Sequence, residues 1–167
     1  MTDVKTGPNP LFLREEDLRQ GMELLFYAYR DFTAEPDAML AKIALGRAHH
    51  RVVYFVGRYP GITVSELLAI LQITKQSLSR VLSELVAEGY VEQRTGTKDR
   101  RQRLLALTEK GQELERQLSD AQRARIARAY RAAGAAAVEG FRTVMLGIMD
   151  EADRAKFPPP RAPGTKR

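Results

Sequence analysis

The most informative part of this sequence is residues 63–111, which read TVSELLAILQITKQSLSRVLSELVAEGYVEQRTGTKDRRQRLLALTEKG. The stretch begins with a capping box, because Thr63 can accept a hydrogen bond from the amide of Glu66, whose carboxylate can reach back. A short apolar helix is predicted to follow. Residues 72–73 then turn the chain before Thr74, which is a favourable N-cap for a second helix. The pattern therefore predicts two helices joined by a tight turn.

The second predicted helix starts at Thr74 and ends at Gly89, since a glycine often stands just past a helix. Its apolar residues repeat at helical spacing and share one face: Leu78, Val81, Leu82 and Leu85. Two short strands are predicted next, over residues 90–94 and 103–107, joined as a hairpin by the basic segment that contains Gly96. This order is typical of a winged helix-turn-helix, whose second helix enters the major groove of DNA.

The outer face of the second helix carries groups suited to DNA. Lys75 and Arg80 lie in its N-terminal half, although the helix dipole favours cations at the other end. A local preference broken in this way often marks a functional surface. Glutamine can read adenine and arginine can read guanine, whereas Ser, Thr and backbone amides suit phosphate oxygens. The candidate DNA contacts are Thr74, Lys75, Gln76, Ser77, Ser79 and Arg80, with an ordinary solvated face as the alternative.

The predicted hairpin holds the densest positive charge in the chain. Residues 94–103 contain five basic side chains and one acidic one, a net +4 within a chain whose net charge is +6. Such a focus of charge is what a phosphate-binding surface needs. The candidate DNA contacts here are Arg94, Lys98, Asp99, Arg100, Arg101 and Arg103. A solvated charged loop explains the same composition, and the residues alone leave both explanations open.

The flanking sequence predicts further helices. An apolar stripe at helical spacing runs over residues 11–32, and after an interruption at Pro36 the side chain of Asp37 can cap another helix. Thr108 is expected to cap a long helix that Gly134 breaks. The predicted organisation is a disordered arm over 1–10, dimerisation helices over 11–35 and 109–155, a winged helix-turn-helix lobe over 36–108, and a disordered tail over 156–167.

A homodimer is expected because the flanking helices carry apolar stripes with too little neighbouring chain to cover them. The predicted interface uses Leu18, Met22 and Leu25 near the N-terminus and Tyr130, Phe141, Met145 and Ile148 near the C-terminus. The expected fold class is therefore mainly α, with a small two-stranded β-wing between N- and C-terminal dimerisation helices.

Composition excludes several classes of protein. The 167 residues include no cysteine, so disulfides, thiolate metal sites and thiol redox sensing are excluded. No apolar run approaches the roughly 18 residues of a membrane span, and residues 1–10 lack a signal peptide's apolar stretch, so a cytoplasmic protein without a membrane partner is expected. His49 and His50 are adjacent on a predicted helix and point about 100° apart, which is poor for chelating zinc. No catalytic motif or cofactor loop is present, so no enzyme, cofactor or metal is expected.

Residues 99–111, DRRQRLLALTEKG, resemble the wing signature of the MarR family of bacterial regulators, D-x-R followed by L-x-L-T-x-x-G. Residues 73–80, ITKQSLSR, resemble the family's recognition helix, and the similarity extends over roughly residues 60–111. Residues 46–51, GRAHHR, together with the Asp-Arg-Arg-Gln-Arg wing, resemble the PetP-like branch of the family.

The resemblance implies a triangular dimer whose N- and C-terminal helices interlock. It also implies that the wing arginine, by position Arg101, enters the minor groove and that Asp99 orients it. Most members respond to a small aromatic or phenolic effector. The candidate effector pocket is Phe26, Tyr29, His49, Tyr54 and Phe55, with plain core packing as the alternative for the aromatics.

The expected function is a sequence-specific regulator that binds double-stranded DNA as a homodimer on a pseudo-palindromic operator. A winged-helix adaptor between proteins is the main alternative, although an adaptor has no need of five basic residues in its wing. A nucleoid protein without sequence preference is a further alternative. The sequence does not distinguish repression from activation.

Overall fold

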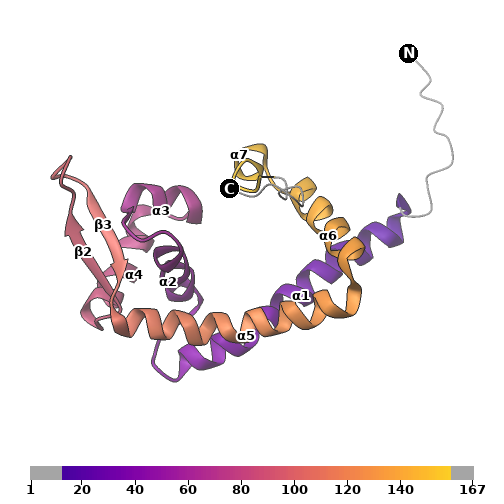
Figure 1. Cartoon of the computed structure of the whole chain (residues 1–167), viewed down its shortest axis with the longest axis horizontal. Helices are drawn as coiled ribbons and strands as arrows, with labels where there is room; N and C mark the ends of the chain where they lie inside the picture. Colours follow the sequence, from indigo (N-terminus) through magenta and orange to yellow (C-terminus); the bar gives the residue numbers. More distant parts are fainter. Residues whose placement is uncertain (1–12, 159–167) are drawn as a thin grey trace, which may run out of the picture. The chain divides into compact units, whose positions relative to one another are not determined.

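The structure is a computed structural model that describes residues 13–158 and contains mainly helices (Figure 1). Its elements are α1 (Glu15–Ala41), α2 (Arg47–Arg58), β1 (Ile62–Thr63), α3 (Val64–Leu71), α4 (Lys75–Ala87), β2 (Val91–Thr95), β3 (Arg103–Leu107), α5 (Glu109–Ala133), α6 (Ala135–Ile148) and α7 (Glu151–Arg154). The chain divides into two compact units, Met1–Arg123 and Ala124–Arg167. The arm expected over residues 1–10 and most of the tail expected over 156–167 lie outside the described residues. None of the described helices combines the length and the apolarity needed to cross a membrane.

The predicted caps of the two central helices are confirmed. The Glu66 amide donates to Thr63 Oγ1 (3.1 Å) and the Thr63 amide donates to Glu66 Oε2 (2.8 Å), which closes the capping box of α3. The Thr63 amide and the Thr63 hydroxyl (3.0 Å) both donate to the Glu66 carboxylate and lower the pKa of this carboxyl, because they stabilise its charged form. Gln72 adopts a left-handed conformation (φ 50°) after α3, and Thr74 Oγ1 then accepts from the Ser77 amide (3.1 Å) to start α4. Local chemistry thus fixes the tight turn.

The wing is the larger part of a three-stranded antiparallel sheet of order β1-β3-β2. Its predicted hairpin is confirmed, with Val91 opposite Leu107 and Thr95 opposite Arg103. The expectation of two strands was incomplete, because Ile62 and Thr63 pair with β3 from its other side. A strand of two residues has no periodicity to reveal it.

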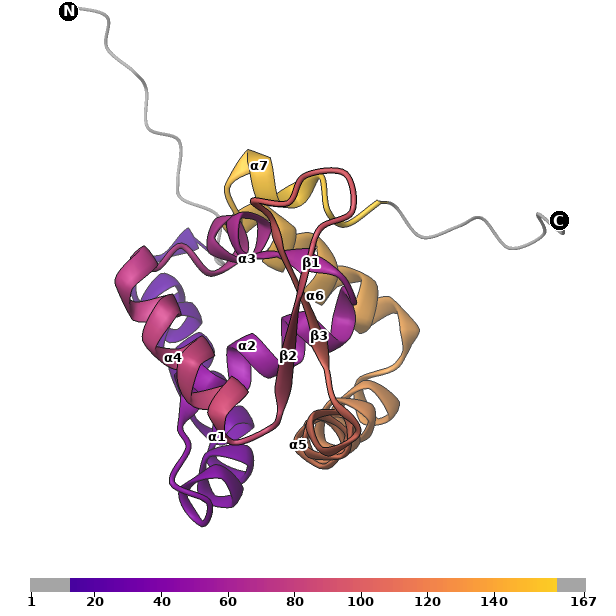
Figure 2. The ribbon, with the colours of Figure 1, turned by 90° about the vertical axis from the view of Figure 1, so that its left-hand side faces the viewer.

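The core of the first unit lies between α2, α3, α4 and the sheet. The predicted apolar face of α4 is buried in it, at Leu78, Val81, Leu82 and Leu85. They share this core with Val52, Val53 and Val56 of α2 and with Leu105 of β3. Figure 2 shows α4 and the β2–β3 hairpin side by side over α2. The core therefore fixes which face of α4 remains outside.

The expected interruption of the first helix at Pro36 was wrong, since α1 continues through this residue to Ala41. A proline inside a helix leaves the carbonyl four residues earlier without its amide partner. Here that carbonyl belongs to Phe32, and Gln122 Nε2 of α5 donates to it (3.3 Å). A tertiary contact thus replaces the missing helical bond.

The start expected for the second helix at Asp37 was also wrong, because α2 begins at Arg47 after the N-cap Gly46. Asp37 instead accepts a hydrogen bond from Arg47 Nη2 (2.6 Å), which also donates to Thr33 Oγ1 (3.2 Å). The carboxylate therefore ties α1 to α2 and caps neither helix.

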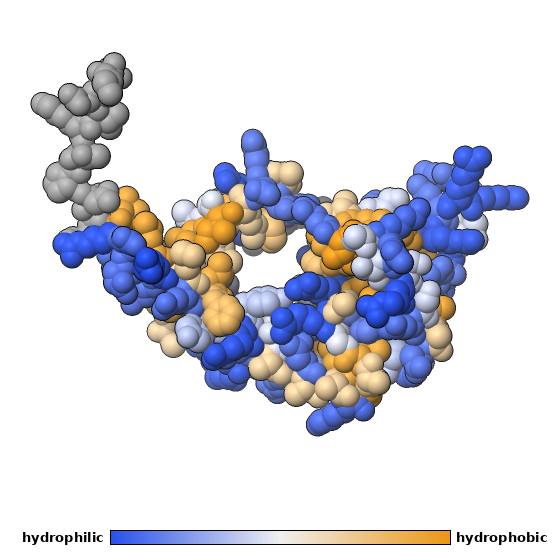
Figure 3. Space-filling model, turned by 180° about the vertical axis from the view of Figure 1, so that it is seen from behind, coloured by the Kyte–Doolittle hydropathy of each residue, from blue (hydrophilic) through white to orange (hydrophobic). Residues whose placement is uncertain are grey.

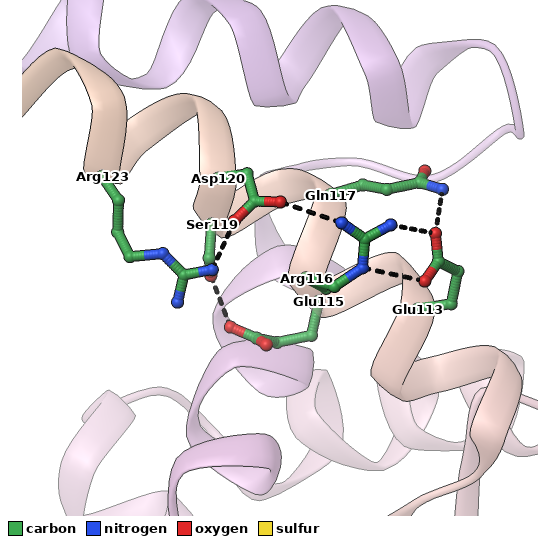
Figure 4. A network of polar contacts seen from close by, with 7 residues as sticks. All are labelled: Glu113, Glu115, Arg116, Gln117, Ser119, Asp120 and Arg123. Carbon is green, nitrogen blue, oxygen red and sulfur yellow. Dashed lines mark hydrogen bonds and ion pairs between the residues drawn. The ribbon is translucent and has the colours of Figure 1, made fainter.

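The exposed side of α5 balances its own charge. Arg116 pairs with Glu113 (2.6 Å) and Asp120 (3.0 Å), and Arg123 pairs with the same Asp120 (2.5 Å; Figure 4). Exposed pairs of this kind stabilise a helix only slightly. Two cations and two anions cancel, so this face adds no net charge to the first unit.

Gly111 in the first turn of α5 is expected to tolerate no side chain. A Cβ there would lie 2.0 Å from the Tyr90 carbonyl oxygen. Gly111→Ala should lower the free energy of unfolding by about 3 kcal/mol, measured by urea titration. Gly140→Ala is the control, since nothing lies within 4 Å of that position in α6. The control should gain about 0.5–1 kcal/mol. Equal midpoints for the two variants would contradict the expectation.

Lowering the pH from about 7 to about 5 should destabilise the fold through His50. Burial lowers the pKa of His50 below its ordinary 6.5. The positive charge of Arg51 lowers it further, whereas the negative charges of Asp37 and Glu115 act in the opposite direction. In this range the unfolded chain therefore binds a proton that the folded chain does not. The stabilisation is complete above pH 6.5 and is lost as the pH falls below that value. Urea unfolding across this range measures the slope, which His50→Gln should flatten; an unchanged slope would count against this role.

Candidate nucleic-acid interface

The first part of the candidate interface is the outer face of α4. Burial of its apolar face leaves all six candidate residues exposed: Thr74, Lys75, Gln76, Ser77, Ser79 and Arg80. Thr74 Oγ1 also donates to Ser77 Oγ (2.8 Å), so these two hydroxyls help to define the helix start. Within residues 13–158 the side chains of Lys75 and Gln76 have no hydrogen-bond or ion-pair partner, which leaves them available to a ligand.

The second part is the wing tip, residues 96–102, which joins β2 to β3. The Gly96 amide donates to the Gln102 carbonyl (3.0 Å), and the Gln102 amide donates to the Asp99 carbonyl (3.1 Å). A Cβ at position 96 would lie 2.6 Å from the Asp99 carbonyl oxygen, so the close turn requires glycine there. These bonds give the exposed tip a defined backbone.

Asp99 acts on the backbone of the wing tip. Its Oδ1 accepts a hydrogen bond from the amide of Arg101 (2.9 Å), as in an Asx-turn. The resemblance to the MarR family implied that Asp99 orients Arg101, and in the structure Asp99 contacts the backbone amide of Arg101.

The wing cations fall into two groups. On the strands, Arg94 pairs with Glu92 (2.5 Å) and Arg103 donates to Thr95 Oγ1 (3.2 Å). At the tip, the exposed side chains of Lys98, Arg100 and Arg101 have no ion pair with any other described residue. Figure 3 shows the hydrophilic side chains of the hairpin end projecting into solvent, at its right-hand edge. The charge available to a ligand is therefore concentrated at the tip.

Two contacts to α4 were missed by the sequence analysis. His49 Nε2 lies 2.5 Å from Glu84 Oε2, and Lys110 Nζ donates to the Glu88 carbonyl oxygen (2.7 Å). Each pair joins residues more than 20 positions apart in the chain. No local pattern marks such partners.

The candidate effector residues have different partners in the first unit. Tyr29 accepts a hydrogen bond from Arg51 (3.0 Å), while Phe26 is exposed on α1. The rings of Tyr54 and Phe55 meet edge to face, with centroids 5.1 Å apart. His49 contacts Glu84 of α4. The pocket remains a prediction.

The pattern of the MarR family matches residues 45–102, from the start of α2 to the wing tip. The HTH-type transcriptional regulator PetP of Rhodobacter capsulatus is 53% identical over 156 residues, which cover 93% of this chain and 94% of PetP.

Solved structures show the same fold. One is a MarR family transcriptional regulator from Listeria monocytogenes complexed with 26mer DNA, with TM-score 0.64 and 19% identity over 84% of this chain and 97% of that one. Another is Streptococcus pneumoniae FabT in complex with DNA, with TM-score 0.61 and 20% identity over 84% and 89% of the two chains. At such identities the similarity concerns the fold.

The similarity to PetP extends over almost the full length of both proteins and includes the helices that flank the winged helix. These relatives are transcriptional regulators, not enzymes. The resemblance inferred from residues 99–111 is confirmed: this chain belongs to the MarR family of transcriptional regulators.

Proposed function

We propose that this chain is a sequence-specific regulator that binds a pseudo-palindromic operator in double-stranded DNA as a homodimer and responds to a small aromatic effector. The observation that carries the proposal is the combination of an exposed N-terminal half of α4 with unpaired cations at the wing tip. The two parts belong to one compact unit, so they can contact one duplex together.

The exposed half of α4 suits the major groove. A helix fits that groove, and its N-terminal residues are then nearest to the base edges. Gln76 offers the donor and the acceptor that read adenine, and Arg80 offers the two donors that read guanine. The free amides at the helix start, with Thr74 and Lys75, suit phosphate oxygens, which position the protein without reading sequence.

The wing tip suits the minor groove. Arg101 is exposed and carries no ion pair among the described residues, so no protein contact has to break before it meets DNA. Asp99 holds the amide of Arg101 and thereby restricts the backbone of the tip, which lowers the entropy lost on binding. The proteins from Listeria monocytogenes and Streptococcus pneumoniae share this fold and are complexed with DNA, which supports the same use here.

Homodimerisation is supported by apolar surface on helices of both units. On α1 the side chains of Met22 and Phe26 are 73% and 64% exposed, and Leu18 and Leu25 lie on the same helix. Figure 3 shows apolar surface beside the grey N-terminal trace, where α1 begins. In the second unit Phe141, Val144 and Ile148 are exposed on α6. A second copy of the chain is the occupant we propose, because a two-fold dimer presents two copies of α4 to two half-sites.

The proposed effector site lies where α1 meets α2. Its proposed aromatic members are Tyr29 of α1 and Tyr54 and Phe55 of α2, and Arg51 supplies a cation next to the Tyr29 hydroxyl. Aromatic walls with a few polar groups are typical of small-molecule sites. The contact of His49 with Glu84 would connect this region to α4.

The dimer is expected to have twice the 18.8 kDa mass of one chain in light scattering. Footprinting should then protect two half-sites about 10 base pairs apart, since each recognition helix enters one groove. Met22→Glu should shift the protein towards monomer by placing charge in the interface. Gln112→Glu adds the same charge at an exposed position of α5 and should leave the dimer intact. A wild-type monomer that protects one half-site would refute the dimer.

Arg101→Ala should weaken binding to a selected operator by about tenfold or more and reduce the salt slope by about one unit. Preference for A·T-rich flanks should fall too, because a narrow minor groove attracts arginine. Gel shifts at several salt concentrations measure both effects. Arg116→Ala is the control, as it removes the same charge from the balanced face of α5.

A second pair of variants tests the backbone role of Asp99. Asp99→Ala and Asp99→Asn remove the same charge, but only asparagine keeps an acceptor for the Arg101 amide. The asparagine variant should therefore bind more tightly than the alanine variant.

Normal binding by Arg101→Ala with the dimer intact would mean that the wing does not contact DNA.

A further inference from the structure

Three side chains form a continuous polar connection from the start of α2 to the exposed face of α4. The Gly46 amide donates to His49 Nδ1 (3.0 Å), and His49 Nε2 contacts Glu84 Oε2 at 2.5 Å. The other oxygen of this carboxylate, Oε1, lies 4.0 Å from Arg80 Nη1, which is an ion pair without a hydrogen bond. The connection ends at a residue proposed above to read a base.

The contacts define the tautomer of His49. Because Nδ1 accepts from the Gly46 amide, the proton of the neutral ring lies on Nε2, where it is donated to the Glu84 carboxylate. One ring therefore serves two purposes, since it caps α2 and binds a carboxylate on α4. The side chain of His49 is only 13% exposed, whereas that of Glu84 is 44% exposed and that of Arg80 73%. Exposure thus increases along the connection away from its buried anchor.

We propose that His49 and Glu84 are positioning residues that set the orientation of Arg80 and thereby its base selectivity, an inference that rests on the proposed function. Bidentate reading of a base requires the planar guanidinium in one orientation, and an exposed arginine has many. Glu84 lies one helical turn after Arg80 on the same face and attracts its guanidinium. His49 fixes the Glu84 carboxylate in turn. The core-packed helix α2 therefore sets the orientation of Arg80 through His49 and Glu84.

The connection also favours bases over phosphates. The fixed carboxylate repels a phosphate, so a guanidinium beside it gains less binding energy from a lone phosphate than a free guanidinium would. A base edge carries no net charge and offers acceptors to the donors of the arginine. Loss of the connection should therefore reduce discrimination more than it reduces affinity for random DNA.

Two substitutions of His49 separate its contacts without changing the charge of the neutral ring. In His49→Asn the amide oxygen can still accept from the Gly46 amide, but nothing reaches Glu84. In His49→Gln the longer side chain can bring an amide N–H to Glu84. Glu84→Gln and Glu88→Gln form a second pair, since each removes one negative charge, from α4 and from its C-cap respectively, and His49 bonds to Glu84.

The test is a double-mutant cycle on duplex DNA selected from random sequence by the wild-type dimer. The relevant base is the position at which Arg80→Ala loses discrimination, by roughly 5- to 150-fold for one side chain–base pair. His49→Asn and Glu84→Gln should each reduce discrimination at that position by roughly fivefold, and neither should add to Arg80→Ala. His49→Gln should restore most of it, and Glu88→Gln should leave it unchanged.

The inference is overturned if His49→Asn reduces base discrimination equally in the wild-type protein and in the Arg80→Ala variant, since a purely structural role acts in both backgrounds. If the wild-type dimer selects a sequence and no position depends on Arg80, the inference also fails while the proposed function stands. If the wild-type protein selects no sequence at all, the proposed function itself fails. The contact is tested without DNA by ring nitrogen NMR, which is simple in a chain with two histidines. A proton on Nδ1 of His49 near neutral pH would overturn the assignment.

Discussion

The arrangement of the candidate interface depends on the burial of one face of α4. Leu78 and Leu85 are fully buried against α2 and the sheet, together with Val81 and Leu82. Burying side chains of this size stabilises the fold by about 1.5–3 kcal/mol each, far more than any single exposed polar contact. Rotation of α4 about its axis would expose this face, so the polar side chains between Lys75 and Arg80 must lie outside. The apolar core thus fixes the side of the helix that can meet a ligand.

The wing follows from the same core by another route. Leu105 and Leu107 anchor β3 inside, and the sheet register then places residues 96–102 at the far end of the hairpin. The tip has no core of its own, so its shape comes from hydrogen bonds to Asp99 and Gln102. The side chains of the arginines on the strands have protein partners, whereas the side chains of those at the tip have none among the described residues. Backbone order and free charge therefore coincide at the tip.

What the sequence could predict was the part of the structure that depends on neighbouring residues. The capping box at Thr63, the N-cap at Thr74 and the helical spacing of the apolar residues of α4 all arise within a few positions of the residues concerned. The errors concern distant partners. Pro36 remains inside α1 because Gln122 satisfies the freed carbonyl of Phe32, and β1 forms because β3 offers a free edge. The contact between His49 and Glu84 spans 35 residues, so no local spacing could reveal it.

The charge order of α4 shows how distant partners complete a local pattern. The last turn of α4 contains no basic residue, although the helix dipole favours cations there. Lys110, from the start of α5, supplies that cation by donating to the Glu88 carbonyl oxygen, and His49 supplies a partner for Glu84. The Glu84 carboxylate and the Glu88 carbonyl at the C-terminal end of α4 thus have partners within the first unit. At the N-terminal half Lys75 has no anionic partner among the described residues, and the dipole repels it as well. An external anion at that end, such as a DNA phosphate, would remove this imbalance, so the unfavourable half of the pattern is the half that faces the proposed ligand.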